Sequence, residues 1–456
     1  MREARVVEDS SLSVVRAGSW VMYDFANTIY SFAVVTFLLP PAIESVSRSN
    51  LAVSLVSVAS MVFAGLVVPG IGVWTDRKAC TKRLLGWTTA FCSIFCLLLA
   101  VLLANQLSEP YASDRTIALP SSNTWSVIAI CIIFFGANAF YQIALNLYNS
   151  LLVVAAPRSH WGVVSGIGVG VGYLGSLFTM VFLLAFNLSF PPLGIAFAAV
   201  SLIVFTIPLI LFVPERDVSP DQAGKPLSFL GPTKDVLGTI RLLPRNRVLF
   251  FGLLGNFLCV DALNTLILFI TVYVQKTVYQ GGADPERSVT VLFIALILSS
   301  FLASFVNGRL ADRIGSMKTL LVSAVFLLIA LVFGVLTTAY STVFFWGVVL
   351  TGGMGLTGFW IAGRKMIAEY SPVEHRGLFF GLYGMVTKVG ALTTISFALA
   401  TWMLPEFGIA EATAYRIGMA TLLVPVIIGL FLLSKVWSAT PPPPGEVNLA
   451  QRDIPV

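Results

Sequence analysis

Twelve long apolar segments constrain the fold of this chain more than any other feature of its sequence. They cover residues 18–40, 52–74, 84–104, 125–155, 162–186, 193–213, 248–274, 288–308, 318–339, 342–368, 377–401 and 412–436. A helix needs about 20 apolar residues to cross a bilayer, and none of the segments alternates as the strands of a membrane β-barrel do. With 57% hydrophobic and 11% charged residues, the sequence predicts an all-α membrane protein with twelve transmembrane helices.

The basic residues predict how these helices are oriented. If the N-terminus is cytoplasmic, 22 of the 28 Lys and Arg residues lie on the cytoplasmic side, as the positive-inside rule requires. Both termini are therefore predicted to be cytoplasmic. This orientation, together with contact with anionic membrane lipid, explains the net charge of +6. The basic residues form no patch with interleaved aromatic residues, so no nucleic-acid partner is predicted.

The sequence also contains an internal repeat. Asp24–Thr28 (DFANT) matches Asp261–Thr265 (DALNT) at an offset of 237, and Gly72–Arg77 (GVWTDR) matches Gly308–Arg313 (GRLADR) at an offset of 236. The repeat predicts two six-helix halves of parallel orientation, with a binding site between them near the bilayer midplane. The predicted domains are a cytoplasmic N-terminus at 1–17, bundles at 18–213 and 248–436, a cytoplasmic linker at 214–247, and a disordered cytoplasmic tail at 437–456.

The two repeated Gly–Asp–Arg motifs resemble the cytoplasmic signature of the major facilitator superfamily. Glycine lets two helices approach closely, and an aspartate can bind the free N–H groups at a helix start. The resemblance implies that Gly72, Asp76, Arg77, Gly308, Asp312 and Arg313 form a gating motif. We expect Asp76 to cap the helix that starts near Leu378–Phe380, and Asp312 the helix that starts near Val163–Ser165.

Four stretches carry a narrower resemblance. They are Trp20–Phe32 (WVMYDFANTIYSF), Leu147–Leu152 (LYNSLL), Ser165–Gly175 and Phe379–Lys388. Together they resemble the vacuole-effluxer-like family, also called unknown major facilitators. That family includes a fungal vacuolar amino-acid exporter, so the resemblance implies amino acids as a substrate class. It implies the inner membrane of a bacterium, or the vacuolar or lysosomal membrane of a eukaryote, as the location.

Three ionisable residues lie clearly within the predicted spans, namely Asp24, Asp261 and Lys388. Each costs roughly 2.5–3.5 kcal/mol to place at the centre of a bilayer, so each should face a cavity or a partner. The substrate and coupling site is predicted to comprise Asp24, Asn27, Thr28, Asn138, Gln142, Asn149, Asp261, Asn264, Tyr383 and Lys388. The alternative is a structural polar network that only orients the helices.

These patterns predict a secondary active transporter that works as a monomer by alternating access. Its cargo would be a small polar solute, with amino acids as the leading class and a proton as the candidate co-transported ion. The alternatives are an exporter of amphipathic compounds and a non-transporting receptor or scaffold on the same fold. The sequence contains no P-loop, catalytic triad or metal-ligand cluster, so no enzyme activity, cofactor or metal site is predicted. Cys92 and Cys96 are expected to pack in the core.

Overall fold

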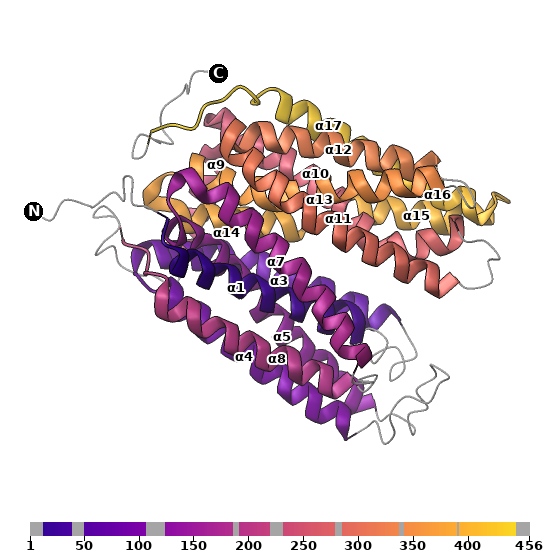
Figure 1. Cartoon of the computed structure of the whole chain (residues 1–456), viewed down its shortest axis with the longest axis horizontal. Helices are drawn as coiled ribbons and strands as arrows, with labels where there is room; N and C mark the ends of the chain where they lie inside the picture. Colours follow the sequence, from indigo (N-terminus) through magenta and orange to yellow (C-terminus); the bar gives the residue numbers. More distant parts are fainter. Residues whose placement is uncertain are drawn as a thin grey trace, which may run out of the picture. The chain divides into compact units, whose positions relative to one another are not determined.

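A computed structural model of the chain describes residues 12–38, 50–105, 124–185, 191–218, 231–278, 285–336, 342–389 and 392–443. Every regular element within these ranges is helical, which confirms the predicted all-α class (Figure 1). The long elements are α1 (Val14–Tyr30), α3 (Asn50–Arg77), α4 (Thr81–Ala104), α5 (Thr124–Ser150), α7 (Trp161–Ala185), α8 (Pro191–Phe212), α9 (Gly231–Leu242), α10 (Arg247–Thr277), α11 (Pro285–Ile314), α12 (Ser316–Leu336), α13 (Thr342–Tyr370), α14 (Arg376–Val389), α15 (Leu392–Glu406), α16 (Glu411–Thr421) and α17 (Leu423–Ser434).

Among these described residues, ten segments are long and apolar enough to cross a membrane. They coincide with ten of the twelve predicted spans. The first predicted span, 18–40, overlaps α1 and the π-helix η1 (Ser31–Leu38) that continues it, and the tenth, 342–368, overlaps α13. Residues 106–123 and most of the predicted tail lie outside the described residues.

The contacts divide the chain into two compact units. Unit 1 comprises Met1–Arg158, Val171–Val236 and Glu374–Lys388, and unit 2 comprises Ser159–Gly170, Leu237–Val373 and Val389–Val456. The units therefore depart from a plain division of the sequence at the linker. Unit 1 contains most of α14 from the second half of the sequence, and unit 2 contains the beginning of α7 from the first half.

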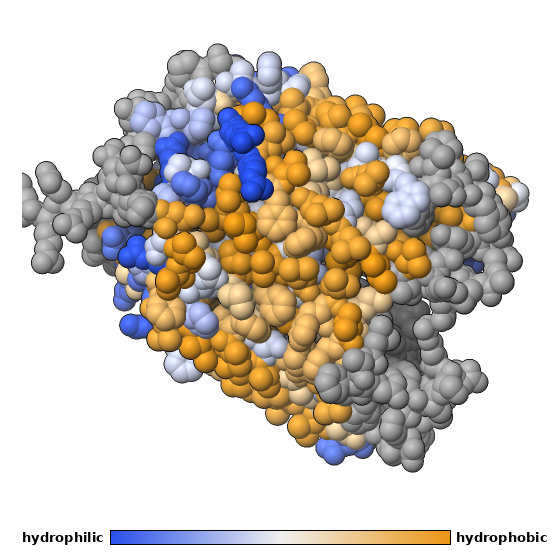
Figure 2. Space-filling view, in the orientation of Figure 1, coloured by the Kyte–Doolittle hydropathy of each residue, from blue (hydrophilic) through white to orange (hydrophobic). Residues whose placement is uncertain are grey.

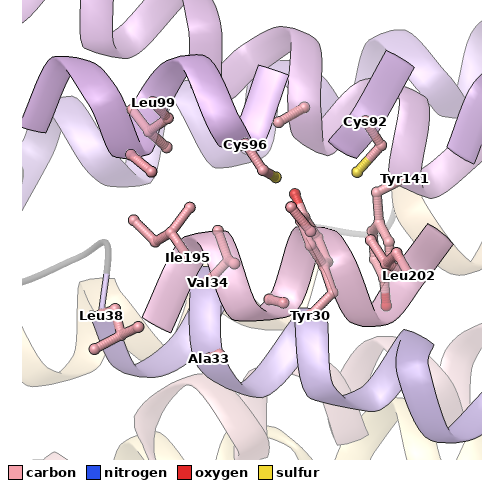
Figure 3. Packing of buried hydrophobic residues seen from close by; sticks show 14 of the residues in the cluster. Tyr30, Ala33, Val34, Leu38, Cys92, Cys96, Leu99, Tyr141, Ile195 and Leu202 are labelled. Atoms are coloured by element: carbon pink, nitrogen blue, oxygen red, sulfur yellow. The ribbon is translucent and has the colours of Figure 1, made fainter. Parts of the chain in front are cut away.

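In unit 1, α4 packs against α5 and α8, α1 packs against α8, and α3 packs against α5. Figure 3 shows Tyr30 of α1 pointing toward Cys92 and Cys96 of α4. The ring centroids of Tyr30 and Tyr141 are 4.3 Å apart. Both cysteines are buried in this hydrophobic core and are free thiols, so their predicted role as packing residues is confirmed.

In unit 2, α13 packs against α11 and α12, α10 packs against α17, and α15 packs against α16. The turn between α11 and α12 is made by Gly315, whose φ of 89° lies in the left-handed region that favours glycine. This glycine ends α11 one residue after Ile314 and fixes the start of α12 at Ser316. The turn thereby positions the end of α11, where the second gating motif lies.

The outer surfaces of the helices are apolar. Large hydrophobic side chains remain exposed along α4 and α8, for example Val101 (60%) and Leu211 (67%). Figure 2 shows hydrophobic residues over most of the drawn surface of the long helices. Soluble proteins rarely expose patches of this extent, whereas lipid tails can solvate them.

Candidate functional site

The polar face predicted for the first span is buried within unit 1. Asp24 is 3% exposed and Asn27 is 7% exposed. The Asn27 side-chain amide donates to Asp24 Oδ1 at 3.4 Å, and the Thr28 hydroxyl donates to the backbone carbonyl of Asp24 at 2.8 Å. The three residues therefore form one local polar group on α1, with the carboxylate at its centre.

A second polar stripe runs along α5. The Asn138 amide donates to Ser60 Oγ of α3 at 2.7 Å, so this residue joins two helices of the same bundle. Gln142 and Asn149 lie further along the stripe and are 9% and 8% exposed. The amide oxygen of Asn149 is buried and accepts no hydrogen bond within the described part of the chain.

Asn146 belongs to this stripe, although sequence reasoning did not single it out. It is 4% exposed, and its amide oxygen also accepts no hydrogen bond from the described residues. It lies directly against Gly384 of α14, where a side chain larger than hydrogen would collide with it. The signal for Asn146 was its spacing of four residues from Gln142, which places both on one helix face.

Helix α14 brings Tyr383 and Lys388 into unit 1. Tyr383 is 2% exposed, and Gly381 packs against Pro69 of α3. Within the described residues, no carboxylate forms an ion pair with the Lys388 ammonium. This cation lies in the last described turn of α14.

Asp261 occupies a different environment, in unit 2. Its Oδ2 accepts a hydrogen bond from the backbone N–H of Thr393 at 3.1 Å, at the start of α15. The hydroxyl of Thr265, one turn further along α10, lies 2.7 Å from that of Thr393. Asp261 is 3% exposed, and its second oxygen accepts no hydrogen bond from the described residues. Asn264 follows Asp261 by three residues and also belongs to α10.

The predicted eleventh span, 377–401, contains α14 and α15, and residues 390–391 between these helices lie outside the described part of the chain. Asp261 binds a backbone N–H in the first described turn of α15.

The capping role predicted for Asp312 is confirmed. Its Oδ1 accepts from Gly162 N at 2.8 Å and its Oδ2 from Val163 N at 2.7 Å, in the first turn of α7. The contact is one residue earlier than expected. Gly308 permits it, because Gly308 and Gly162 pack so closely that a Cβ at either position would contact the backbone of the other.

Asp76 makes the equivalent contact in unit 1. Its two oxygens accept from Gly377 N at 2.7 Å and Leu378 N at 2.8 Å, in the first turn of α14. A Cβ at Gly72 would collide with the carbonyl of Gly377. In the rest of the predicted motif, Arg77 is the last residue of α3, and Arg313 is exposed near the end of α11.

Each capping aspartate has a basic partner that sequence reasoning missed. Arg216, which follows α8, pairs with Asp76 at 2.5 Å. Lys365 of α13 pairs with Asp312 at 2.5 Å and with Glu369 at 3.5 Å. Lys365 and Glu369 lie near the end of α13, and both are buried. Their spacing of four residues was the available signal.

The described residues contain no group of three or more His, Cys, Asp or Glu side chains that could hold a metal ion. The ionisable groups of the predicted site lie in both units. Asp24 and Lys388 belong to unit 1. Asp261 belongs to unit 2, where it binds Thr393, whose hydroxyl lies against that of Thr265.

The sequence is similar to transporters of one superfamily along nearly its whole length. The sequence profile of the Major Facilitator Superfamily matches residues 25–283 and 282–455. An uncharacterized MFS-type transporter of Bacillus subtilis, YxiO, is 25% identical over 466 residues, which cover 96% of this chain and 98% of the relative. Both proteins therefore align over nearly their whole length.

Solved structures share the fold at low identity. A bacterial homologue of the iron transporter ferroportin, in its outward-facing state, matches with a TM-score of 0.66 at 14% identity and covers 93% of this chain and 99% of its own. The proton:xylose symporter XylE matches with a TM-score of 0.61 at 14% identity and covers 93% and 98%. At these identities the likeness concerns the fold.

Proposed function

Because the chain belongs to the Major Facilitator Superfamily, we propose that it is a secondary active transporter that moves a small polar solute by alternating access. It is a multi-pass membrane protein with the fold of that superfamily. The relative YxiO comes from a bacterium, which supports a location in the cytoplasmic membrane.

The observation that carries this proposal is the pair of equivalent capping contacts. Asp76 and Asp312 occupy matching positions in the repeat, and each binds the first turn of a helix from the other half of the sequence. These contacts are hydrogen bonds, so they can break and re-form as alternating access requires. Both motifs lie on the side predicted to be cytoplasmic, and the two contacts would keep that side closed.

The solute site is proposed to include the polar residues of unit 1. Asp24 would receive an amine and Lys388 a carboxylate, while Asn146 and Asn149 would offer their buried amide oxygens. A zwitterion such as an amino acid satisfies both charges. The resemblance to the vacuole-effluxer-like family supports the same class, and a carboxylate-bearing solute would supply the counter-ion that Lys388 lacks among the described residues.

Uptake into proteoliposomes tests transport directly. Purified protein would be reconstituted and loaded with a panel of unlabelled amino acids, and entry of each labelled counterpart would be measured by counterflow. We expect flux for at least one solute. A receptor or scaffold on the same fold would give no flux for any solute, and that result would refute the proposal.

A second experiment tests whether the contact between Asp312 and the start of α7 closes the cytoplasmic side. Asp312→Asn removes the charge that attracts Lys365 and the start of α7, so the inward-open state should become more populated. A cysteine introduced at Ser165, which is fully buried, should then react at least fivefold faster with a soluble thiol reagent. Asp217→Asn, the same change at an exposed carboxylate, is the matched control. An unchanged rate in Asp312→Asn would remove this contact from the gate.

A further inference from the structure

A groove lies between the start of α4 and the end of α8, outside the sites described above. Its volume is about 550 Å³. Its walls are formed by two basic residues, an aromatic residue, a glycine, an isoleucine and an acid, namely Lys82, Arg83, Trp87, Gly86, Ile210 and Glu215. All of them belong to unit 1.

The charges in the groove favour an anion. Arg83 is exposed and forms no ion pair or hydrogen bond within the described residues. Lys82 uses one ammonium hydrogen to donate to the carbonyl of Ile210 at 2.9 Å, which leaves two others. The carboxylate of Glu215 is already engaged, because its oxygens accept from Lys82 N at 3.0 and 3.3 Å. Two cations therefore face one carboxylate that is bound to the start of α4.

The remaining surface of the groove favours a lipid over a soluble anion. Trp87 is 59% exposed, and exposed tryptophan is typical of the membrane–water interface. Below it, the outward face of α4 is apolar, with Ile94 and Leu98 each 50% exposed. A ligand that fits both parts has an anionic head group and a hydrocarbon tail.

Gly86 keeps the groove open. A Cβ at this position would lie 3.1 Å from Cδ1 of Ile210 on α8. Any larger side chain here would fill the space between the two helices without changing the charge. Gly86 therefore offers a way to block the groove that is independent of Arg83.

We propose that this groove binds the phosphate head group of an anionic phospholipid from the cytoplasmic leaflet, with Arg83 and Lys82 as its ligands and Trp87 against the glycerol region. Juxtamembrane basic residues attract anionic lipid through their charge. The groove adds a shaped site to that general attraction. A lipid bound in this groove would contact both the end of α8 and the start of α4.

Native mass spectrometry of the full-length purified protein tests the proposal. The probes are phosphatidylglycerol and phosphatidylcholine with identical acyl chains. We expect Arg83→Gln and Gly86→Leu each to weaken phosphatidylglycerol binding at least fivefold while leaving phosphatidylcholine binding unchanged. Arg16→Gln, the same charge change at an exposed residue on α1, should have no effect.

Three outcomes would overturn the proposal. Equal weakening by Arg16→Gln would mean that binding depends on net charge and not on this groove. Unchanged phosphatidylglycerol binding in both groove variants would mean that the lipid binds elsewhere. Full displacement of the lipid by inorganic phosphate at millimolar concentration would assign the groove to a soluble anion instead. Thermal unfolding of each variant would verify that it is folded.

Discussion

At the scale of single residues, the buried charges fall into two kinds. Asp76 and Asp312 are bound by two backbone N–H groups and one basic side chain each. Replacing one partner of such a buried ion pair typically costs about 3–5 kcal/mol, because the other charge is left unpaired. Lys388 has no ion-pair partner among the described residues, so its charge is available to a ligand.

Replacing Lys388 by methionine tests this availability. The variant should fold nearly normally, because no carboxylate among the described residues loses its partner. We expect its KM for solutes with a carboxylate to rise at least tenfold, which corresponds to about 1.4 kcal/mol, while decarboxylated analogues should be affected less. Uptake kinetics in proteoliposomes would measure both. Lys78→Met, a change at an exposed lysine, serves as the control, and an unchanged KM for the carboxylate solute would exclude Lys388 from binding.

At the scale of secondary-structure elements, the glycines of the repeated motifs decide how closely helices pack. Gly72 lies against the backbone of Gly377, and Gly308 against that of Gly162. The capping hydrogen bonds of Asp76 and Asp312 form at the same two crossings. Close packing and helix capping therefore depend on each other.

Substitution of Gly72 by alanine should destabilise the protein, because the added methyl group collides with the carbonyl of Gly377. Overpacking of this kind costs about 1–3 kcal/mol. Gly18→Ala is the matched control: a methyl group added to Gly18 in α1 would have no atom within 4 Å, and alanine favours a helix by up to about 1 kcal/mol over glycine. Thermal unfolding should thus show a lower midpoint for Gly72→Ala only. Equal midpoints for both variants would contradict the packing argument.

Some features of the helices could be predicted from the sequence, and others could not. Ten of the spans were predictable from length and hydropathy, and both capping contacts were predictable from the repeated motif and its resemblance to the superfamily signature. Lys365 and Arg216 were not, because each lies where a basic residue is expected to face the cytoplasm, and only the structure shows that it is buried beside an aspartate.

At the scale of the whole molecule, transport against a gradient requires a group that binds and releases the coupled ion during the cycle. Asp24 is a candidate, since it is buried in unit 1 among amide and hydroxyl groups. Asp24→Asn keeps the size and the hydrogen-bonding oxygen of the side chain but cannot carry a proton. The variant should lose accumulation driven by a proton gradient and retain part of the downhill exchange.

Proteoliposomes with and without an imposed pH gradient would measure these two activities separately. Asp217→Asn provides the same substitution at an exposed position and should behave like the parent protein. Accumulation by Asp24→Asn at the parental level would show that another group carries the coupled ion.

The π-helix at the end of the first span has a consequence for the history of the chain. From the first aspartate of each repeat to the glycine of its motif, the first half spans 72 − 24 = 48 positions and the second 308 − 261 = 47. If the halves descend from one duplicated ancestor, one insertion or deletion has occurred in this interval. A wider turn accommodates one additional residue within a helix, and the first half contains such turns at Ser31–Leu38. A residue inserted at these turns would lie downstream of Asp24 and would leave the register of that aspartate unchanged.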